Sequence, residues 1–312
     1  MRAEVVIPSW ERRDDLRRAL ASLGLEDDVG VCVIDNGSSD GTAAMVRSEF
    51  PAARLIALER NAGFGAAVNM AARTSRGQFL ILMNNDAVAD PGFIAALIAA
   101  REASGAAMVA GCMVDSSGLV ESAGVTVDQS LTIFDHLNGA RREDLSDASV
   151  PPLGPSGGAA LYERDAFLAV GGFDERIFAY LEDVDLALRL RIAGHMCALA
   201  TGATVLHRHS STLGMGSSAK NRLMVRNRRY LEWKYGRNLS RARRARGAII
   251  ELIVLLGRVV IDRNFGGIAG WRDGAREFPM TSAPPADPRF REVPLERLSA
   301  AAALRRRLRR RT

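Results

Sequence analysis

The sequence predicts an α/β fold built around a mostly parallel sheet, and three observations lead to that prediction. Short apolar runs alternate with segments of helical periodicity up to about residue 110, a pattern that gives βαβ units with right-handed crossovers. Several of these runs end in Asp, Asn or Gly, where parallel sheets bind their ligands. A chain of 312 residues, 47% of them hydrophobic, can also bury one large core or a domain with a smaller appendage.

The first part of the chain supplies the elements in order. EVVIP, VGVCVID, ARLIALE and QFLILMNND are expected strands. The expected helices are DDLRRALASL, with Asp14 and Asp15 favourable near its start, then GSSDGTAAMVRSEF, NAGFGAAVNMAART and PGFIAALIAARE. These elements make residues 1–110 one half of a larger domain.

The second part is less regular. Residues 111–155 are expected to hold a strand or hairpin and then a mobile loop, whereas residues 156–215 regain order with a helix over EDVDLALRLRIAG and a strand over CALATGATVLHR. We expect a first domain over 1–215 with halves 1–110 and 111–215. A basic helical extension over 216–278 and a flexible basic tail over 279–312 complete the organisation.

Composition restricts the class of protein. Cys32, Cys112 and Cys197 are far apart and form no CxxC pair, which predicts buried free thiols in a reducing compartment. The chain opens on a strand rather than a signal peptide and holds no apolar run of spanning length, so a cytoplasmic protein is expected. The basic helical region, rich in arginine over 220–246, suggests peripheral contact with an anionic membrane at its inner face, with Ile249 to Ile261 at the interface. A solvated charged face is the alternative.

Polar residues after the second strand are candidates for ligand contact. Asp35 could accept hydrogen bonds from a base or ribose, and Gly37 lets the backbone approach. The alternative is an Asx turn that caps the next helix, which we favour for Asp40 but not for Asp35. In the loop 61–69, Asn61 and Asn69 are the better ligand candidates, because for Gly65 tight packing of the helix start is at least as plausible.

The fourth strand ends in Asn84, Asn85 and Asp86, which alone would indicate a turn. Together with His207 after a later strand, Asp86 predicts a site for Mg²⁺ or Mn²⁺ in which diphosphate oxygens complete the coordination. A structural histidine is the alternative for His207.

Three carboxylates, Glu182, Asp183 and Asp185, begin the helix over EDVDLALRLRIAG. The helix dipole favours acids at that place whatever their function. Arg189 and Arg191 follow, so some of these acids are expected in ion pairs. A carboxylate left free in a cleft would suit a general base for a hydroxyl.

Taken together and in this order, the motifs VIDNGSSDGT, RNAGFGAAVN, FLILMNND, SGGAALYERDAFLAVGGFDERIFAYLEDVDLALRLRIAG and VLHRHSST resemble the family 2 glycosyltransferases of the GT-A fold. The bacterial rhamnosyltransferases and related polysaccharide or cell-wall enzymes are the most similar members. The resemblance extends from Val5 to about Tyr235.

The resemblance implies a role for each matching residue. Asp183 would be the catalytic base with Glu182 beside it, and Asp86 and His207 would bind the divalent cation. The donor, a dTDP- or UDP-linked sugar, would lie against Pro8, Ser9, Trp10, Asp35, Asn36, Gly37, Asn61, Gly63, Gly65, Asn69, Asn84, Asn85, Gly157 and Gly158. The implied reaction is inverting transfer, with rhamnose as the first expectation, to a hydroxyl of a glycan, glycolipid or lipid-linked acceptor.

Two features depart from the family pattern. The usual DxD motif is Asn84-Asn85-Asp86 here, which leaves one acid, and the first strand ends in IPSWER rather than VTYNR.

Two other functional classes remain as alternatives. A sugar-nucleotide nucleotidyltransferase would need a glycine-rich loop where SWERRDD stands. A nucleic-acid-binding module would need aromatics among its arginines, yet aromatics make up 6% of the chain and do not alternate with them, so no nucleic-acid partner is expected.

Overall fold

The computed structural model describes residues 1–147, 150–207 and 217–308. The chain divides into two compact units. The first consists of Met1–Val125 and Asp135–Thr212, and the second consists of Thr126–Phe134 and Leu213–Thr312. Each unit has its own packing.

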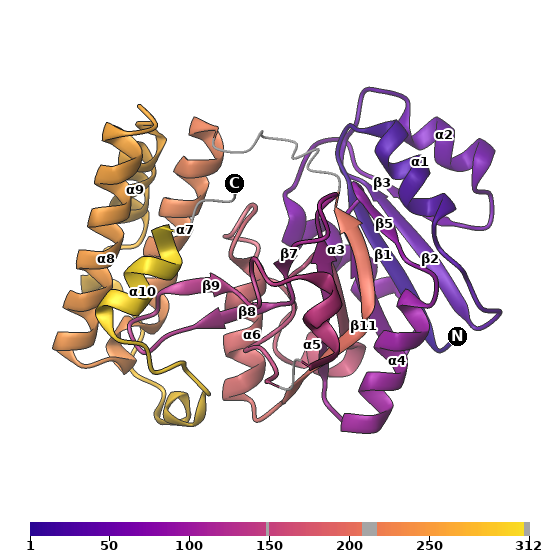
Figure 1. Ribbon diagram of the computed structural model, residues 1–312. Coiled ribbons are helices and arrows are strands. Elements are labelled where there is room, and N and C mark those ends of the chain that lie inside the picture. The colour runs from indigo at the N-terminus through magenta and orange to yellow at the C-terminus, as the bar shows by residue number, and fades with distance from the viewer. Residues whose placement is uncertain (148–149, 208–216, 309–312) are drawn as a thin grey trace. The chain divides into compact units, whose positions relative to one another are not determined.

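The first unit contains a mixed, mostly parallel sheet (Figure 1). Its strand order is β3 (Arg54–Ala57), β2 (Val29–Asp35), β1 (Ala3–Ser9), β4 (Phe79–Met83), β10 (Ala159–Glu163), β6 (Met108–Val114), β11 (Cys197–His207) and β5 (Ala87–Ala89), and β7 (Val120–Ser122) pairs with β6. Strands β3, β2, β1 and β4 run parallel to one another, and β6 runs parallel to β11. Strand β10 runs antiparallel between β4 and β6.

Helices cover both faces of this sheet. The apolar side chains of α1 (Arg13–Ala21), α2 (Thr42–Glu49) and α4 (Phe93–Ser104) pack on one face in a single buried cluster with β1, β2 and β4. On the other face lie α3 (Phe64–Thr74) and α5 (Arg164–Ala169), where Phe64, Tyr162, Phe167 and Phe173 make edge-to-face contacts. The unit also contains η1 (Arg142–Asp147) and α6 (Glu182–Ile192).

The second unit is mostly helical. It contains α7 (Ser218–Tyr235), η2 (Gly236–Asn238), α8 (Arg241–Val260), α9 (Gly266–Glu277), η3 (Met280–Ser282), η4 (Pro288–Glu292) and α10 (Ala300–Leu308). Gly266 and Gly270 let α9 approach α7 closely, because a Cβ at Gly270 would lie 2.1 Å from the carbonyl oxygen of Arg222. The short strands β8 (Val125–Val127) and β9 (Ile133–Asp135) pair with each other, and Arg246 of α8 reaches the buried Asp128 at 2.5 Å.

The predicted fold class is confirmed, including a basic helical region after the sheet. The strand at Val29–Asp35 has the predicted bounds, and the other predicted strands differ from the observed ones by one to three residues at their ends. Strand β10 was not predicted as such. Within the segment for which the sequence predicts a flexible tail, Phe290, Val293 and Ala303 are buried. In the part of the chain that the structure describes, no helix combines the length and apolar character that a membrane span requires.

Candidate active site

The carboxyl ends of β1, β2 and β4 bring three of the predicted loops together. Ser9 and Asp35 are register partners at the ends of β1 and β2. The backbone N–H of Asn36 donates to the carbonyl of Ser9 at 2.7 Å, and Nδ2 of Asn85 donates to Oγ of Ser9 at 3.0 Å. Pro8 lies within β1, and Trp10, just beyond it, is partly exposed. The loops after the three strands therefore form one polar edge.

Asp35 holds the loop after β2 through its side chain and does not cap α2, which begins at Thr42. Oδ1 of Asp35 accepts the backbone N–H of Ser38 at 3.0 Å, and Gly37 has a φ of 79°. Asp40 forms the expected Asx turn just before α2, because its Oδ1 accepts both the backbone N–H and the hydroxyl of Thr42, the first residue of that helix. Asp35 thus keeps Oδ2 for a further contact in this edge.

Two asparagines connect this loop to the one before α3. Nδ2 of Asn36 donates to Oδ1 of Asn61 at 3.0 Å, and Oδ1 of Asn36 accepts the backbone N–H of Ala62 at 2.8 Å. Gly63, with a φ of 92°, is required here, because a Cβ would lie 2.5 Å from the carbonyl oxygen of Phe178. Asn36, Asn61 and Gly63 therefore hold the shape of the donor-side edge.

Asn69 braces a distant loop. Its Oδ1 accepts the backbone N–H of Phe173 at 2.8 Å, and its Nδ2 donates to the carbonyl of Phe173 at 2.8 Å and to Glu175 at 3.0 Å. Gly65 packs against the same phenylalanine, since a Cβ there would meet Cβ of Phe173 at 2.8 Å. The packing alternative for Gly65 is thus what the structure contains.

Asp86 and His207 lie side by side at this end of the sheet. β11 pairs with β5 so that His207 is opposite Ala87, the residue after Asp86. Nε2 of His207 consequently lies 3.2 Å from Oδ1 of Asp86. On the other side of the ring, Nδ1 lies 2.5 Å from Oε2 of Glu121, a buried carboxylate on β7. His209 and the remainder of VLHRHSST lie outside the described residues.

These contacts shift the pKa values of both groups. Burial lowers the pKa of His207, but the hydrogen bonds that its ring donates to Asp86 and Glu121 outweigh burial and raise the pKa to about 9. Burial would raise the pKa of Asp86, yet His207 holds it below its ordinary value. No group of three or more His, Cys, Asp or Glu side chains suited to a metal ion is found within residues 1–147, 150–207 and 217–308. Asp86 and His207 are thus the two protein ligands on which the predicted cation site depends.

Helix α6 presents its three carboxylates to different surroundings. Asp183 is half-buried, and its oxygens accept the backbone N–H groups of Val184 at 2.8 Å and Gly157 at 3.3 Å. Asp185 is completely buried and pairs with Nε of Arg189 at 2.8 Å, as the sequence led us to expect for some of these acids. Asp183 is therefore the acid of this helix that a substrate can reach.

Glu182 is buried beside Asp183, and its Oε2 has no hydrogen-bond partner in the described part of the chain. Burial, and then the charge of Asp183, raise the pKa of Glu182. Burial also raises the pKa of Asp183, although its two backbone hydrogen bonds act against that shift. Of the two, Asp183 is the carboxylate that its contacts stabilise in the ionised form.

The backbone just before α6 is strained. Tyr180 and Leu181 both have a φ of 70°, in the left-handed region that residues other than glycine rarely occupy. Burial, and then the charges of Glu182 and Asp86, raise the pKa of Tyr180. The catalytic-base and cation candidates are connected through the backbone at 157–158, which donates to Asp183 and accepts the N–H of Asn84, two positions before Asp86.

Gly157 and Gly158 bring the backbone close to polar side chains of the site. The carbonyl of Gly158 accepts the backbone N–H of Asn84 at 3.4 Å, and a Cβ at Gly158 would lie 2.8 Å from Nδ2 of the same asparagine. Gly157 meets Phe64 in the same way and also donates to Asp183. The backbone at 157–158 therefore lies between Asn84 and Asp183.

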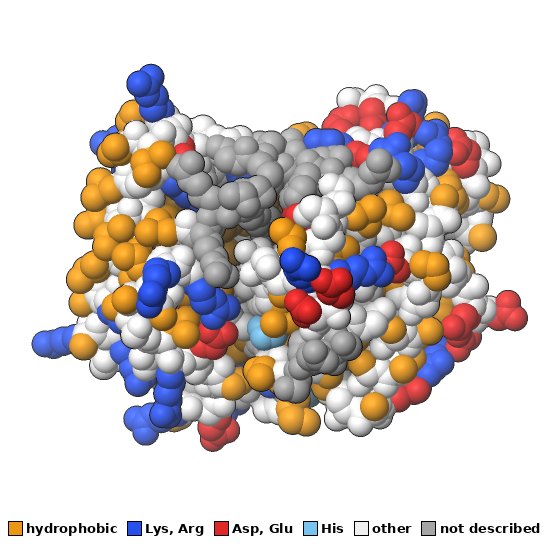
Figure 2. Space-filling model, in the orientation of Figure 1, with side chains coloured by type: hydrophobic (Ala, Val, Ile, Leu, Met, Phe, Trp, Pro, Cys, Tyr) orange, Lys and Arg blue, Asp and Glu red, His pale blue; other side chains and the backbone are white. Residues whose placement is uncertain are grey.

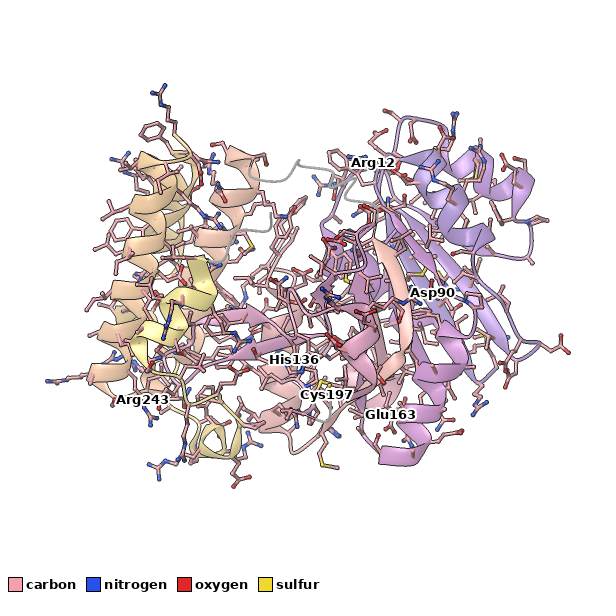
Figure 3. The ribbon with its side chains drawn as sticks, viewed as in Figure 1. Arg12, Asp90, His136, Glu163, Cys197 and Arg243 are labelled. Carbon is pink, nitrogen blue, oxygen red and sulfur yellow. The ribbon has the colours of Figure 1, made fainter. Side chains whose placement is uncertain are left out.

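Three residues of this site were not predicted from the sequence. Glu121 contacts a histidine 86 positions away and belongs to no motif. Tyr180 carries no local signal either. Arg12 could have been suspected from IPSWERR: its charge helps to lower the pKa of Asp86, its φ is 67°, and Figure 3 shows it near the same end of the sheet.

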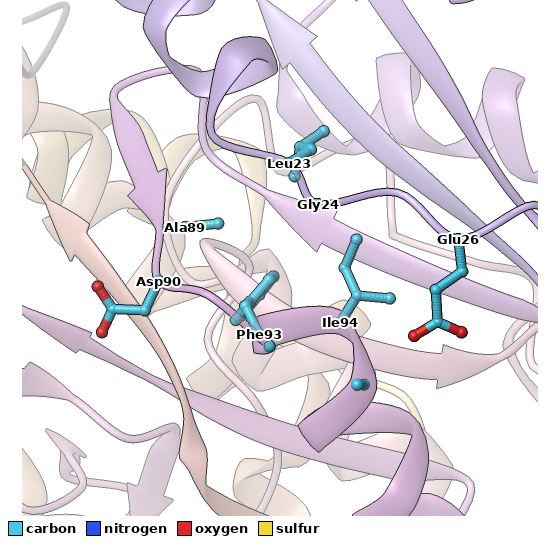
Figure 4. Close-up of a pocket in the computed structure, with 9 residues that line it drawn as sticks. Leu23, Gly24, Glu26, Ala89, Asp90, Phe93 and Ile94 are labelled. Carbon is cyan, nitrogen blue, oxygen red and sulfur yellow. The ribbon is translucent and has the colours of Figure 1, made fainter.

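A separate pocket of about 190 Å³ lies between the α1–β2 connection and the start of α4 (Figure 4). It is lined by Leu23, Gly24, Glu26, Ala89, Asp90, Gly92, Phe93, Ile94 and Ala95. None of the predicted site residues lines it, and its Asp90 forms an ion pair with Arg142. We therefore locate the candidate site at the carboxyl end of the sheet.

Comparison with known proteins identifies the class of enzyme to which this geometry belongs. Residues 4–169 match the family described as Glycosyl transferase family 2. The chain belongs to that family. It is also 34% identical over 236 residues to the N-acetylglucosaminyl-diphospho-decaprenol L-rhamnosyltransferase of Mycobacterium tuberculosis, an alignment that covers 67% of this chain and 77% of the relative. The predicted glycosyltransferase class is confirmed, in preference to a nucleotidyltransferase or a nucleic-acid-binding module.

Solved structures confirm the GT-A fold of this glycosyltransferase. S. aureus TarS in complex with UDP-GlcNAc matches with a TM-score of 0.56 at 16% identity, over 91% of this chain and 82% of TarS. GalNAc-T7 with UDP, GalNAc and Mn²⁺ matches with a TM-score of 0.61 at 16% identity, over 92% of this chain and 59% of that one. At these identities the likeness concerns the fold.

Proposed function

We propose that this glycosyltransferase catalyses inverting transfer of a sugar from a nucleoside diphosphate to a hydroxyl of a lipid-linked glycan, with Asp183 as the general base. The observation that carries the proposal is the environment of Asp183. It is half-buried, hydrogen-bonded by Gly157 and Val184, and adjacent to the more deeply buried Glu182. Such a carboxylate is held in place yet stays open to an acceptor.

Proton transfer follows from these contacts. Two backbone donors favour the ionised form of Asp183, whereas Glu182 has no such donor on Oε2 and keeps its proton more readily. Asp183 takes the proton of the acceptor hydroxyl while that oxygen bonds to the anomeric carbon. The bond from the anomeric carbon to the diphosphate breaks on the opposite face, which inverts the configuration.

Asp86 and His207, which we call the metal corner, fit a divalent cation such as Mn²⁺ or Mg²⁺. A carboxylate oxygen of Asp86 and Nε2 of His207 converge, and both side chains are largely buried. A carboxylate oxygen of Glu121 accepts a hydrogen bond from Nδ1 of His207, an arrangement that fixes the orientation of a ligating histidine. When bound, the cation would offset the charge that grows on the leaving diphosphate.

The donor-binding role is proposed for the edge formed by the ends of β1, β2 and β4. Pro8, Ser9, Trp10, Asp35 and Gly37 would lie along the nucleotide, with Asn84, Asn85 and the backbone of Gly157 and Gly158 along the sugar and diphosphate. Asn36, Asn61, Gly63, Gly65 and Asn69 enter the proposal mainly through the loops that they hold. Similarity to the mycobacterial relative favours dTDP-L-rhamnose as donor, with a UDP-sugar second.

The name of the same relative suggests the acceptor, an N-acetylglucosaminyl diphosphate carried on a polyprenol. An acceptor of this kind would give the enzyme a place in polysaccharide or cell-wall biosynthesis. It also remains in the bilayer, so the proposal includes peripheral binding of the enzyme to the inner face of a cell membrane.

The test is a transfer reaction with purified protein, Mn²⁺, dTDP-L-rhamnose and N-acetylglucosaminyl-diphospho-polyprenol, with UDP-GlcNAc as the comparison donor. Mass spectrometry would detect the product, and NMR of its anomeric proton would give the configuration. We expect a rhamnosylated product whose anomeric configuration is opposite to that of the donor. Retention of configuration would contradict the proposed mechanism, and transfer from UDP-GlcNAc alone would contradict the donor.

A further inference from the structure

Helix α8 presents an unusual row of apolar side chains to solvent. Ile249, Leu252, Ile253, Leu256 and Val260 are each between 40% and 75% exposed. At about 100° per residue, their spacing of i, i+3, i+4, i+7 and i+11 places them within a sector of roughly 100°. Isolated exposed aliphatic residues are common, but an ordered row of five is not.

The opposite side of α8 already makes the contacts that hold the helix in the second unit. Gly247, Ile250 and Val254 are buried, and Gly247 packs against the backbone of Ser130. Arg246 extends to Asp128, which is completely buried. The exposed row is therefore not required for the packing of this helix.

Two groups of arginines in the second unit differ in their partners. Those of α7 are in ion pairs: Arg222 with Asp273, Arg226 with Glu277, Arg228 with Glu251 and Arg229 with Glu232. By contrast, Arg241, Arg243 and Arg244 are exposed, and no ion pair joins them to a carboxylate of the described chain.

The second group stands where a helix disfavours cations. Arg241, Arg243 and Arg244 occupy the first turn of α8, which contains no acid, although the helix dipole makes that end positive. Figure 3 shows Arg243 at this end of the helix, and Figure 2 shows hydrophobic side chains gathered over α8 and α9 with Lys and Arg at their margins. These arginines cost stability where they stand, so they point to an external anion.

We propose that the exposed face of α8 is a docking surface for an anionic lipid bilayer. The aliphatic row would insert at the boundary between headgroups and acyl chains. At about 100° per residue, Arg241 lies about 70° and Arg243 and Arg244 about 130° from the centre of that row, so these arginines would reach anionic headgroups from the polar side of the helix. Ile261, Phe265 and Trp271 are further exposed apolar residues of the same unit. The biological sense of this inference rests on the proposed lipid-linked acceptor, but the binding itself can be measured without any substrate.

The experiment is flotation of the full chain with vesicles that contain neither donor nor acceptor. Vesicles of phosphatidylcholine with phosphatidylglycerol would be compared with vesicles of phosphatidylcholine alone, at low and high salt. We expect binding to the anionic vesicles that weakens with salt. Replacing Arg241, Arg243 and Arg244 together by Gln should weaken it on the order of 100-fold, since each arginine near an anionic surface contributes about fivefold.

A matched pair of variants tests the aliphatic row. Leu252→Gln with Leu256→Gln should weaken binding at least tenfold, whereas Leu25→Gln with Met196→Gln, which changes exposed apolar residues of the first unit, should leave it within twofold. Failure of the wild type to bind anionic vesicles would overturn the proposal. So would a dimer in solution that the Leu252 and Leu256 changes dissociate, because a second copy would then cover this face.

Failure here is distinguishable from failure of the proposed function. Vesicle binding by a protein that transfers no sugar would leave the docking surface intact and refute the reaction. Transfer to a water-soluble acceptor by a protein that ignores anionic vesicles would refute the docking surface and leave the reaction intact.

Discussion

Asp185 and Asp183 stand two positions apart on α6, and we predict opposite consequences when each is changed to an amide. Asp185 has no exposed surface, and its carboxylate lies 2.8 Å from Nε of Arg189. Arg189 also donates to the carbonyl of Val170 at 2.7 Å, so it cannot turn to solvent without losing a second bond. Asp185→Asn would remove the carboxylate charge that lies 2.8 Å from this largely buried guanidinium.

Loss of one partner from a buried ion pair costs about 3–5 kcal/mol. Because the amide oxygen can still accept one hydrogen bond and Arg189 keeps some exposure, we expect the lower end, about 3 kcal/mol. For Asp183→Asn we expect a change of about 1 kcal/mol or less. Burial raises the pKa of Asp183, so the amide removes an unfavourable charge while it loses one of the two backbone hydrogen bonds, because the NH2 group cannot accept.

Urea unfolding followed by circular dichroism would measure both free energies of unfolding, with an unchanged m-value as evidence that the comparison is valid. The reasoning is refuted if Asp185→Asn costs less than about 1 kcal/mol, or if Asp183→Asn costs as much as Asp185→Asn does.

Three further predictions concern the base, the metal corner and the loop before α3. Burial raises the pKa of Asp183 above 3.8, so kcat/KM should rise with pH as a group with a pKa above that value loses its proton. Glu182→Gln should keep this rise in the pH profile, since Glu182 is still protonated in that pH range. A rise centred at pH 3.8 or below would contradict the assignment. Asp86→Asn should abolish the extra thermal stabilisation that Mn²⁺ gives to the complex with dTDP or UDP, measured by thermal shift. The control Asp90→Asn should keep that stabilisation. An undiminished Mn²⁺ effect in Asp86→Asn would place the cation elsewhere. Gly63→Ala should destabilise the fold by about 1–3 kcal/mol, because its Cβ would meet the carbonyl of Phe178. Gly92→Ala, also at positive φ but with open space around it, should destabilise the fold less. Equal losses of stability in calorimetry would show that the contact with Phe178 is unimportant.

Most of the sheet could be predicted because its strands are buried on both faces and read as continuous apolar runs. Val29–Asp35 is such a run, with a turn directly after it. Strand β10 could not be recognised in the same way. Ala159–Glu163 fits a helix or a strand, and only pairing with β4 and β6, which are distant in sequence, decides between them.

The candidate site was predicted in part for a similar reason. Motif and strand-end position lead to Asp86, His207 and Asp183, since these depend on local elements. The separation of Asp183 from Asp185 needs burial, which no spacing within one helical turn reveals. Asn69 looks like a ligand contact in the sequence, yet its hydrogen bonds go to Phe173, 104 positions away. Glu121 is invisible without the β6–β7 pairing that carries it towards His207.

The most direct test of the central claim compares Asp183→Asn with Glu182→Gln in single-turnover sugar transfer. Both changes replace a carboxylate by an amide at adjacent positions of α6, and nucleotide binding by calorimetry would confirm that each variant keeps its donor site. We predict that Asp183→Asn lowers the rate by at least 1,000-fold, within the roughly 10²–10⁴-fold range of a general base, while Glu182→Gln loses less than tenfold. Asp183→Asn protein that binds nucleotide and transfers sugar at the wild-type rate would contradict the account.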